Sequence, residues 1–356
     1  MKNILFFFST TQIGGAETNI ILISRELAEN GYNIFFAYVK DNGPFFQRID
    51  FVQKGKLEIG PLKNVCRASL RYHNFIRENK IDVVFNFGLR VEIFSRIFSK
   101  LFGVSKVISN IRGADLYKPK LQVFLDRITK DLTDYWVSNS KAALDVYHVR
   151  EKIPIEKSIV IYNFLDDSVN LPKNKHLHKN FSNSIGILAN ITENKGYFDL
   201  IKLSELLSQI GMKHKFIFAG EDKTNGQFFN ALNNSKVKGN FMYLGRIDNK
   251  YDFFSSIDIF ILPSYTEGMP TSIMEAMSYG VPVISTNVGG IPEQITDGYN
   301  GILCTPGDIN ALKEGIFALQ DCSVREKYVS RSFDILKNKF RKEKSINMFI
   351  NIIEGE

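Results

Sequence analysis

The chain has 356 residues, of which 44% are hydrophobic and 23% charged; this is an ordinary globular composition and excludes a disordered or collagen-like chain. The length is comfortable for two domains, each large enough to bury a core. The formal net charge of +7 favours an anionic partner, such as a phosphate or an acidic membrane face. The charges are spread along the chain rather than blocked together, so nucleic acid is not expected as a partner.

Cysteine usage and the apolar runs indicate the compartment. Cys66, Cys304 and Cys322 lie far apart in the sequence, which predicts reduced thiols in a cytoplasmic protein and no zinc site. The first apolar run, residues 4–8, is too short for a signal-peptide core. No stretch approaches the roughly 20 apolar residues that span a bilayer.

The first half of the chain alternates between predicted strands and helices. A glycine-containing turn at residues 13–17 follows the first strand, and a helical pattern runs from about residue 18 to residue 30. Further helical patterns separate the later strands. Strands are predicted at residues 4–8, 34–39, 83–87, 106–110, 135–138 and 159–163.

The second half repeats this alternation after a break. Residues 166–183 lose all periodicity and hold Pro172, so they are predicted to be a linker. Strands are then predicted at residues 184–188, 215–219, 241–244, 257–262 and 281–285, and helices at residues 198–210, 271–279 and 327–356. This pattern predicts an α/β protein with two doubly wound parallel sheets, which bind ligands at the carboxyl ends of their strands.

The most informative candidates for ligand-binding residues lie within residues 258–293. A predicted strand runs into a loop that holds Glu267, and Pro270 then opens a helix with Thr271 in its first turn. The backbone N–H groups at such a helix start favour an anion or a phosphate. Glu275 lies in the second turn, where a carboxylate can accept two hydrogen bonds from vicinal hydroxyls, as on a ribose. Taken alone, the two could equally be a surface glutamate and a helix-capping glutamate.

The residues around these glutamates form a dense series of motifs. The series is EGMP at residues 267–270, EAM at 275–277, GVPVI at 280–284, GGIPE at 289–293 and PGD at 306–308. It resembles the signature of the GT4-type retaining glycosyltransferases, which have the GT-B fold. GGAE at residues 14–17 is similar to the glycine-rich loop of that family, and the resemblance covers nearly the whole chain.

The resemblance implies two Rossmann-like domains that face a central cleft. Residues 1–165 would form the acceptor-side domain and residues 184–330 the domain that binds a nucleotide sugar. Residues 166–183 would link them. The helical segment 331–356 is expected to pack back on the first domain.

The same resemblance implies roles for individual residues. The glutamate matching Glu267 lies beside the donor sugar, and the one matching Glu275 binds the donor ribose. The lysine matching Lys195 binds the diphosphate, where it would stabilise the charge on the leaving phosphate; the alternative is an exposed loop cation. Gly14 and Gly15 would let the backbone approach the donor closely. The implied donor-binding set is Gly14, Gly15, Asn190, Lys195, Arg246, Gly268, Met269, Pro270, Thr271 and Glu275, and the implied catalytic set is Glu267, Lys195 and Arg112.

Two positions depart from the family pattern. Asn190 stands where an arginine is common, five residues before Lys195. Arg112 stands where many relatives have a histidine on the acceptor side, and it cannot act as a base at neutral pH. It could supply the positive charge missing at Asn190, or it could be a salt-bridged surface arginine. Arg246, within residues 245–247, resembles the region that meets the nucleobase or the diphosphate.

The function implied is that of a hexosyl- or N-acetylhexosaminyl-transferase. It would move a sugar, with retention, from a UDP- or GDP-linked donor to a hydroxyl of a saccharide acceptor. The acceptor would be lipid-linked, in the biosynthesis of a bacterial surface polysaccharide such as a capsule or the O-antigen of lipopolysaccharide. The leaving phosphate would take the acceptor proton, so that the enzyme works by orientation and electrostatics.

No cofactor and no metal are expected. The sequence lacks the Asp-x-Asp motif of the other main transferase fold, and His176 and His178 in the linker are taken as solvated loop residues. Three rivals remain: a nicotinamide-dependent oxidoreductase, an epimerase of similar shape and a non-catalytic donor-binding subunit. The missing G-x-G-x-x-G fingerprint argues against the first. The intact set of Glu267, Glu275 and Lys195 argues against the last.

Residues 90–106 raise the question of a membrane. They combine bulky apolar side chains with cations that include Arg96 and Lys100, a mixture that suits a helix lying on an anionic membrane. The alternative is a core-packed helix with a solvated basic edge. The expected location is therefore cytoplasmic, with peripheral contact at the inner face of the cytoplasmic membrane if the first interpretation holds.

Overall fold

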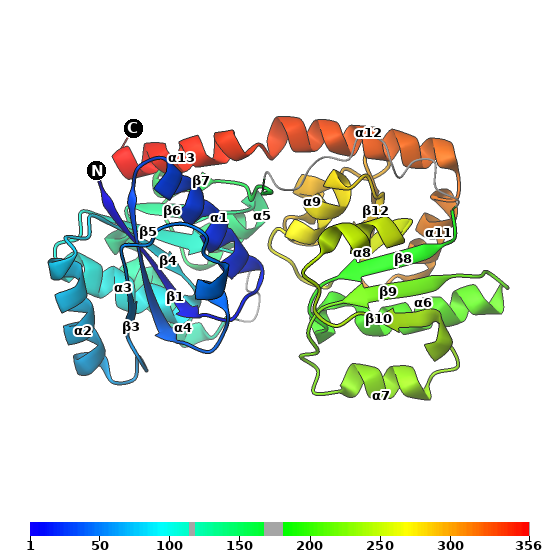
Figure 1. The fold of residues 1–356 in the computed structure, drawn as a ribbon, viewed down its shortest axis with the longest axis horizontal. Coiled ribbons are helices and arrows are strands. Elements are labelled where there is room, and N and C mark those ends of the chain that lie inside the picture. Colours follow the sequence, from blue (N-terminus) through cyan, green and yellow to red (C-terminus); the bar gives the residue numbers. More distant parts are fainter. Residues whose placement is uncertain (114–117, 167–180, 356) are drawn as a thin grey trace. The chain divides into compact units, whose positions relative to one another are not determined.

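The computed structural model describes residues 1–113, 118–166 and 181–355, so most of the predicted linker, with His176 and His178, lies outside the described residues. The chain forms two compact units (Figure 1). One comprises Met1–Phe164 with Lys342–Glu356, and the other comprises Leu165–Arg341. The boundary near the C-terminus lies between helices α12 (Cys322–Lys339) and α13 (Lys342–Glu354), whereas the sequence analysis placed it at residue 331, inside α12.

In its described residues the N-terminal unit holds a seven-stranded parallel sheet in the order β3-β2-β1-β4-β5-β6-β7. Its strands are β1 (Asn3–Thr10), β2 (Asn33–Lys40), β3 (Gly55–Glu58), β4 (Val83–Phe87), β5 (Lys106–Ile111), β6 (Tyr135–Ser138) and β7 (Ser158–Val160). β1 shows why this sheet is buried on both faces. Ile4, Phe6 and Phe8 point into one core cluster, and Leu5 and Phe7 point into the other.

Helices cover both faces of this sheet. α2 (Val65–Glu78) and α3 (Leu89–Leu101) pack on the face of Leu5 and Phe7. α1 (Gly15–Glu29) and α13 pack on the other face, where the Phe349 ring lies 5.9 Å from the Phe85 ring. The last helix of the chain therefore completes the core of the N-terminal unit.

The C-terminal unit is built in the same way. Its described residues form a six-stranded parallel sheet in the order β10-β9-β8-β11-β12-β13. The strands are β8 (Ser184–Leu188), β9 (Lys215–Ala219), β10 (Phe241–Tyr243), β11 (Ile259–Leu262), β12 (Val283–Thr286) and β13 (Ile302–Cys304). The helices are α6 (Tyr197–Gln209), α7 (Gln227–Asn234), α8 (Lys250–Ser256), α9 (Thr271–Ser278), α10 (Ile291–Gln294), α11 (Ile309–Ala318) and α12. The strand order reverses between β8 and β11, and doubly wound sheets bind ligands at the carboxyl side of such a reversal.

The structure corrects the interpretation of residues 90–106. Arg96 is fully buried, Phe94 packs into the core, and Lys100 forms an ion pair of 2.5 Å with Asp134. Of the two interpretations, the structure therefore supports the core-packed helix, and the one that exposes Arg96 to a membrane is wrong, because α3 packs on the sheet. Among the described helices, none combines the length and the apolar character needed to cross a bilayer.

Arg96 belongs to a buried ionic cluster that joins α3 to α4 (Lys120–Thr129). Its guanidinium donates to Glu92 at 2.8 Å and to Asp126 at 2.7 Å, and it stacks on the Trp136 ring at 4.3 Å. Lys118 contacts the other oxygen of Asp126 at 2.6 Å. Burial raises the pKa of Glu92 to about 7, although Arg96 acts in the opposite direction.

Candidate functional site

The first part of the candidate site lies where β8 and β11 end. Lys195 closes a short 3-10 turn after β8, and Gly196 follows with a φ of +71°. A Cβ at residue 196 would lie 2.1 Å from the carbonyl oxygen of Pro263, so this close approach requires glycine. The approach places Lys195 Nζ 2.5 Å from Glu267 Oε1. Two residues 72 positions apart in the sequence thus form one ion pair at the strand reversal.

The loop that carries Glu267 is held from both sides. Ser264 donates to Glu267 Oε1 at 2.6 Å, and only 7% of the Glu267 side chain is exposed. Gly289, with a φ of +53°, would bring a Cβ within 2.0 Å of the Glu267 carbonyl oxygen. Gly290 N–H donates to Gly268 O at 2.7 Å. These contacts fix the backbone that leads into α9.

α9 begins directly after this loop. Pro270 occupies the N-cap position with an extended ψ of 120°, and Thr271 is the first helical residue. No side chain caps the helix start. Backbone N–H groups of the first turn therefore supply partial positive charge beside Lys195, which is the chemistry of an anion site.

Glu275 lies one turn into α9 and has a partner that the sequence analysis missed. Lys250, the first residue of α8, places its Nζ 2.8 Å from Glu275 Oε1. The Glu275 side chain is 7% exposed and that of Lys250 is 40% exposed. The two residues stand 25 positions apart on different helices, so no local spacing could have paired them.

A third group gathers at the ends of β8, β9 and β10. Asn190 Oδ1 accepts a hydrogen bond of 3.1 Å from the backbone N–H of Glu221. The Glu221 carboxylate is paired with Lys223 and with Arg246, which together lower its pKa, Lys223 most strongly. The charge of Arg246 is therefore balanced within the unit. Glu221 and Lys223 were not predicted from the sequence, since only the fold brings these loops together.

The remaining predicted residues belong to the N-terminal unit. Gly14 caps α1, and its N–H donates to Glu17 at 3.1 Å. A Cβ at Gly15 would meet nothing within 4 Å, so packing inside the unit does not require a glycine there. The open backbone at this helix start is accessible to a ligand.

Arg112 differs from the salt-bridged surface arginine considered above. Its guanidinium donates to Asn163 at 3.0 Å and to Asn110 at 3.4 Å, and it lies 5.0 Å from the centre of the Phe87 ring. Across the described residues its recorded partners are neutral, and its Nε is buried without a hydrogen bond. Burial lowers its pKa to about 10, so the group stays charged at neutral pH.

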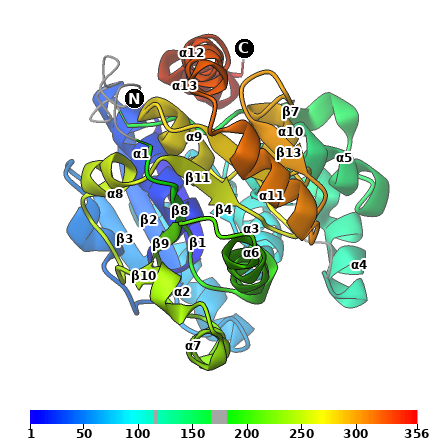
Figure 2. The same cartoon turned by 90° about the vertical axis from the view of Figure 1, so that its right-hand side faces the viewer.

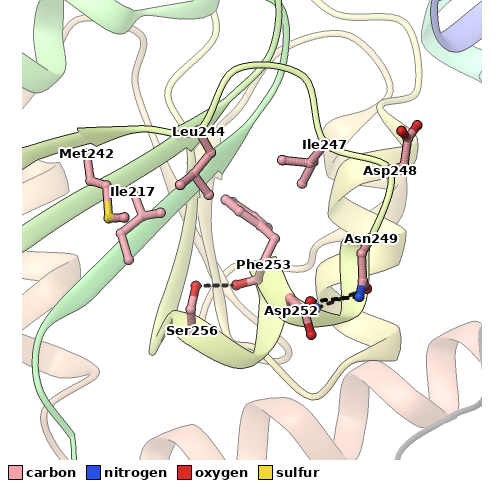
Figure 3. Close-up of a pocket in the computed structure, with 9 residues that line it drawn as sticks. All are labelled: Ile217, Met242, Leu244, Ile247, Asp248, Asn249, Asp252, Phe253 and Ser256. Atoms are coloured by element: carbon pink, nitrogen blue, oxygen red, sulfur yellow. Dashed lines mark hydrogen bonds between the residues drawn. The ribbon is translucent and has the colours of Figure 1, made fainter.

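A separate cavity of about 440 Å³ lies between α8 and the β9–β10 edge of the sheet (Figure 3). Its lining is Ile217, Met242, Leu244, Ile247, Asp248, Asn249, Asp252, Phe253 and Ser256. It shares the loop after β10 with Arg246 but contains neither Lys195 nor the two glutamates. Within the described part of the chain, no three His, Cys, Asp or Glu side chains gather as metal ligands would.

Comparisons with known proteins agree with this architecture. Residues 13–169 match the family model described as Glycosyltransferase Family 4, and residues 170–332 match the one described as Glycosyl transferases group 1. The chain is 24% identical to the N-acetyl-alpha-D-glucosaminyl L-malate synthase of Bacillus anthracis, over 96% of this chain and 93% of that protein. It is 25% identical to the O-antigen biosynthesis glycosyltransferase WclY of Escherichia coli, over 80% of each.

A solved structure gives the same result for the fold. The crystal structure of Anabaena HepE in complex with UDP superposes with a TM-score of 0.85, at 19% identity, over 100% of both chains. The two family models together span most of this chain, and both sheets have the doubly wound order of the GT-B fold. The chain therefore belongs to the GT4-type glycosyltransferases of the GT-B fold and is a glycosyltransferase.

Proposed function

We propose that this enzyme is a retaining transferase that uses a UDP- or GDP-linked sugar and builds a bacterial surface polysaccharide. The ion pair between Lys195 and Glu267 beside the start of α9 carries the proposal, because it combines a cation, a carboxylate and free backbone N–H groups at one strand reversal. A diphosphate binds to the cation and to the backbone N–H groups. The hydroxyls of a sugar donate hydrogen bonds to the carboxylate.

Each group has a distinct task in this proposal. Lys195 turns from Glu267 to the diphosphate and stabilises the charge that grows on the leaving phosphate. Glu267, held by Ser264, then accepts hydrogen bonds from the donor sugar. Glu275 binds the ribose, and its partner Lys250 holds that carboxylate in place.

The loop after β10 is the proposed neighbour of the nucleobase. Arg246 lies in this loop and is already paired with Glu221. Gly14, Gly15 and Arg112 contribute from the N-terminal unit. Within the described residues Arg112 contacts Asn163 and Asn110 and no carboxylate, and in this proposal its charge serves an anionic group of the substrate.

The acceptor and the pathway are proposed from the relatives. One relative is described as an O-antigen biosynthesis glycosyltransferase and another, CapM of Staphylococcus aureus, as acting in capsular polysaccharide biosynthesis. A saccharide acceptor carried on a lipid fits both pathways. The proposed location is cytoplasmic, with peripheral contact at the inner membrane face, and the proposed reaction needs no metal.

Nucleotide binding tests the proposal directly. A thermal-shift panel with UDP, GDP, ADP, CDP and NAD, without metal, should show stabilisation by one nucleoside diphosphate. A ligand at 100 times its Kd adds about 2.7 kcal/mol of stability. Glu275→Ala should abolish the shift, and Glu314→Ala, whose side chain is 69% exposed, should keep it. A shift with NAD alone, or with no nucleotide, would reject the proposed function.

The stereochemistry needs a second measurement. Once the donor is known, the anomeric configuration of the product is read by NMR from the coupling of the anomeric proton. Retention of the donor configuration is expected. Inversion would contradict the proposed mechanism without affecting the assignment of the donor.

A further inference from the structure

The carboxyl ends of β5, β6 and β7 carry buried polar side chains. Three asparagines stand at these ends or just beyond them: Asn110, Asn139 and Asn163, which are 2%, 5% and 4% exposed. The backbone N–H of Asn139 donates to the carbonyl oxygen of Ile111 at 3.3 Å, which continues the register of β5 and β6 and sets Asn139 beside Arg112. This edge of a doubly wound sheet is where ligands bind.

Arg112 and Asn110 lie on one face of the sheet. Side chains alternate along a strand, so Asn110 and Arg112 point the same way, toward the side of Phe87, the partner of Asn110 on β4. The Arg112 guanidinium accordingly lies 5.0 Å from the centre of the Phe87 ring. The other face of β6 and β7 is covered by α5 (Lys141–Arg150), which Figure 2 shows beside β7. The polar group is therefore separate from the apolar packing of α5.

Two of the asparagines hold the guanidinium without neutralising it. Asn163 Oδ1 and Asn110 Oδ1 accept N–H groups of Arg112 at 3.0 and 3.4 Å. The Asn110 amide is fixed in turn, since its Nδ2 donates to the carbonyl oxygen of Asn86 at 3.2 Å. An aspartate at residue 163 would accept the same hydrogen bond and also balance the charge. An amide only orients the guanidinium, and the positive charge is left for another group to meet.

Two atoms of this polar group lack a partner within the described residues. Arg112 Nε and Asn139 Oδ1 are both buried there without a hydrogen bond. Buried donors and acceptors are costly to leave unmet, so native proteins contain few of them. A ligand can supply what each atom lacks, because an anionic oxygen accepts from Nε and a hydroxyl donates to the amide oxygen. Arg112 itself is partly exposed, so a ligand can reach the group from outside the unit.

The charge of the group suits a carboxylate better than a phosphate. The group contains one cation, Arg112, among three neutral amides. A phosphate monoester carries between about 1.5 and 2 negative charges at neutral pH, so one guanidinium leaves part of its charge unmatched. A carboxylate carries a single negative charge, and its two oxygens match the planar fork of a guanidinium.

We propose that Arg112, Asn110, Asn139 and Asn163 form a binding site for a sugar acid in the N-terminal unit. Arg112 binds the carboxylate, and Asn139 Oδ1 accepts a hydrogen bond from a hydroxyl of the same sugar. Asn110 and Asn163 are positioning residues that orient the guanidinium. The sugar acid is the acceptor residue. That last assignment rests on the proposed function, in which groups of the C-terminal unit hold the donor, whereas the binding of a sugar acid does not.

Ligand-observed NMR titrations of the full chain test the site. The probes are the methyl glycosides of glucuronate and galacturonate, the neutral methyl glucoside and galactoside, and glucose 6-phosphate. At least one uronide should bind, and its neutral counterpart and the sugar phosphate should bind about tenfold more weakly or worse. A parent chain that binds neither uronide, or that binds the neutral glycoside or the sugar phosphate as well as the uronide, overturns the proposal.

Two variants test the residues. Arg112→Gln removes the cation and should weaken uronide binding by about tenfold or more. Asn163→Asp keeps the oxygen that accepts from Arg112 and adds the missing negative charge, so it should weaken uronide binding as strongly while the chain stays folded. Arg25→Gln is the matched control, because Arg25 already pairs with Asp50 at 2.8 Å in the same unit, and it should bind as the parent does. Parent-like binding by both test variants would overturn the site.

The nucleotide-induced thermal shift separates this site from the donor site. Both test variants should keep the shift, which also reports that they are folded. Arg112→Gln that loses the shift but keeps the ligand-free Tm of the parent would assign Arg112 to the diphosphate and overturn the proposal. If Arg112→Gln does not fold, Asn163→Asp decides in the same way.

Turnover tests the assignment of the sugar acid as acceptor. With the donor found in the nucleotide panel, the uronide that binds should accelerate release of the nucleoside diphosphate, and its neutral counterpart should not. No acceleration by a bound uronide would overturn its role as acceptor. Uronide binding by a chain that recognises no nucleotide would contradict only the proposed function, and a nucleotide shift without uronide binding would contradict only the sugar-acid site.

Discussion

Replacing Lys195 by Met removes the one cation that contacts Glu267 in the described structure, while keeping an unbranched side chain of similar length. The Lys195 and Glu267 side chains are 22% and 7% exposed, and their charged atoms lie 2.5 Å apart. A surface ion pair is worth at most about 1 kcal/mol, and breaking a fully buried one costs about 3–5 kcal/mol. This pair lies between those limits, so we expect the variant to lose about 2 kcal/mol and to remain folded.

In free energy, Lys195→Met should lose more transition-state stabilisation than folding stability. A preorganised group that meets charge developing in the transition state contributes about 10²–10³ in kcat, or roughly 2.7–4 kcal/mol. Because the charge on the leaving phosphate grows during the reaction, kcat should fall more than KM rises in Lys195→Met. Steady-state release of the nucleoside diphosphate, with the donor found in the nucleotide panel, measures both constants.

A double variant separates the two effects. Adding Glu267→Gln to Lys195→Met replaces the carboxylate that the first change leaves buried without its cation. Thermal stability should then recover toward that of the parent chain, whereas turnover should stay low. A Lys195→Met variant that keeps more than about a third of the parent kcat would refute the assignment. So would a double variant that regains turnover together with stability.

Three further predictions concern the framework of the site. Arg96→Met should lower the unfolding free energy of the N-terminal unit by about 3–5 kcal/mol, because it leaves buried carboxylates without their cation. Lys100→Met, at a partly exposed ion pair, should lower it by less than about 1 kcal/mol. Urea unfolding followed by the fluorescence of Trp136, which stacks on Arg96, measures both, and equal midpoints would contradict the burial argument. The pKa of Glu92 is raised from 4.5 to about 7, so its stabilising effect is complete below about pH 4.5 and is lost as the pH rises through 7. The parent chain should lose about 3 kcal/mol over that window relative to Glu92→Gln, and parallel pH curves would exclude this. Gly196→Ala should lower Tm and abolish nucleotide binding, because its Cβ would collide with the carbonyl oxygen of Pro263. Gly211→Ala is the control: its φ is +74° but a Cβ there meets nothing within 4 Å, so it should cost only about 1–2 kcal/mol of backbone strain. Similar losses of stability in the two variants would count against the collision.

Local sequence was sufficient for the elements that are buried on both faces. β4, β6, β8 and β9 have the bounds that their apolar runs predicted. The fold class and the glycosyltransferase activity were likewise predicted from contiguous motifs and are confirmed. In contrast, β3 was missed, because a four-residue edge strand with the sequence GKLE has no apolar run to reveal it.

Contacts between distant segments could not be predicted. Lys250 meets Glu275, and Arg246 meets Glu221, only because parallel strands bring successive loops to one edge of the sheet. The sequence supplied one partner of each pair and no signal for the other. The candidate site was therefore predictable as a set of segments but not as a set of ion pairs.

The error at Arg96 and the exposed apolar residues of α4 have one physical origin. A cation within an amphipathic pattern is usually solvated, but here Glu92, one turn earlier on α3, and Asp126 on α4 surround Arg96 in the interior. Buried ion pairs add little net stability compared with apolar packing, because desolvation offsets their attraction. Stability alone therefore does not explain why α4 turns its polar face inward. The polar anchoring does have one definite consequence, since the ion pair between Arg96 and Asp126 leaves Leu121, Phe124 and Ile128 on the outside of the unit.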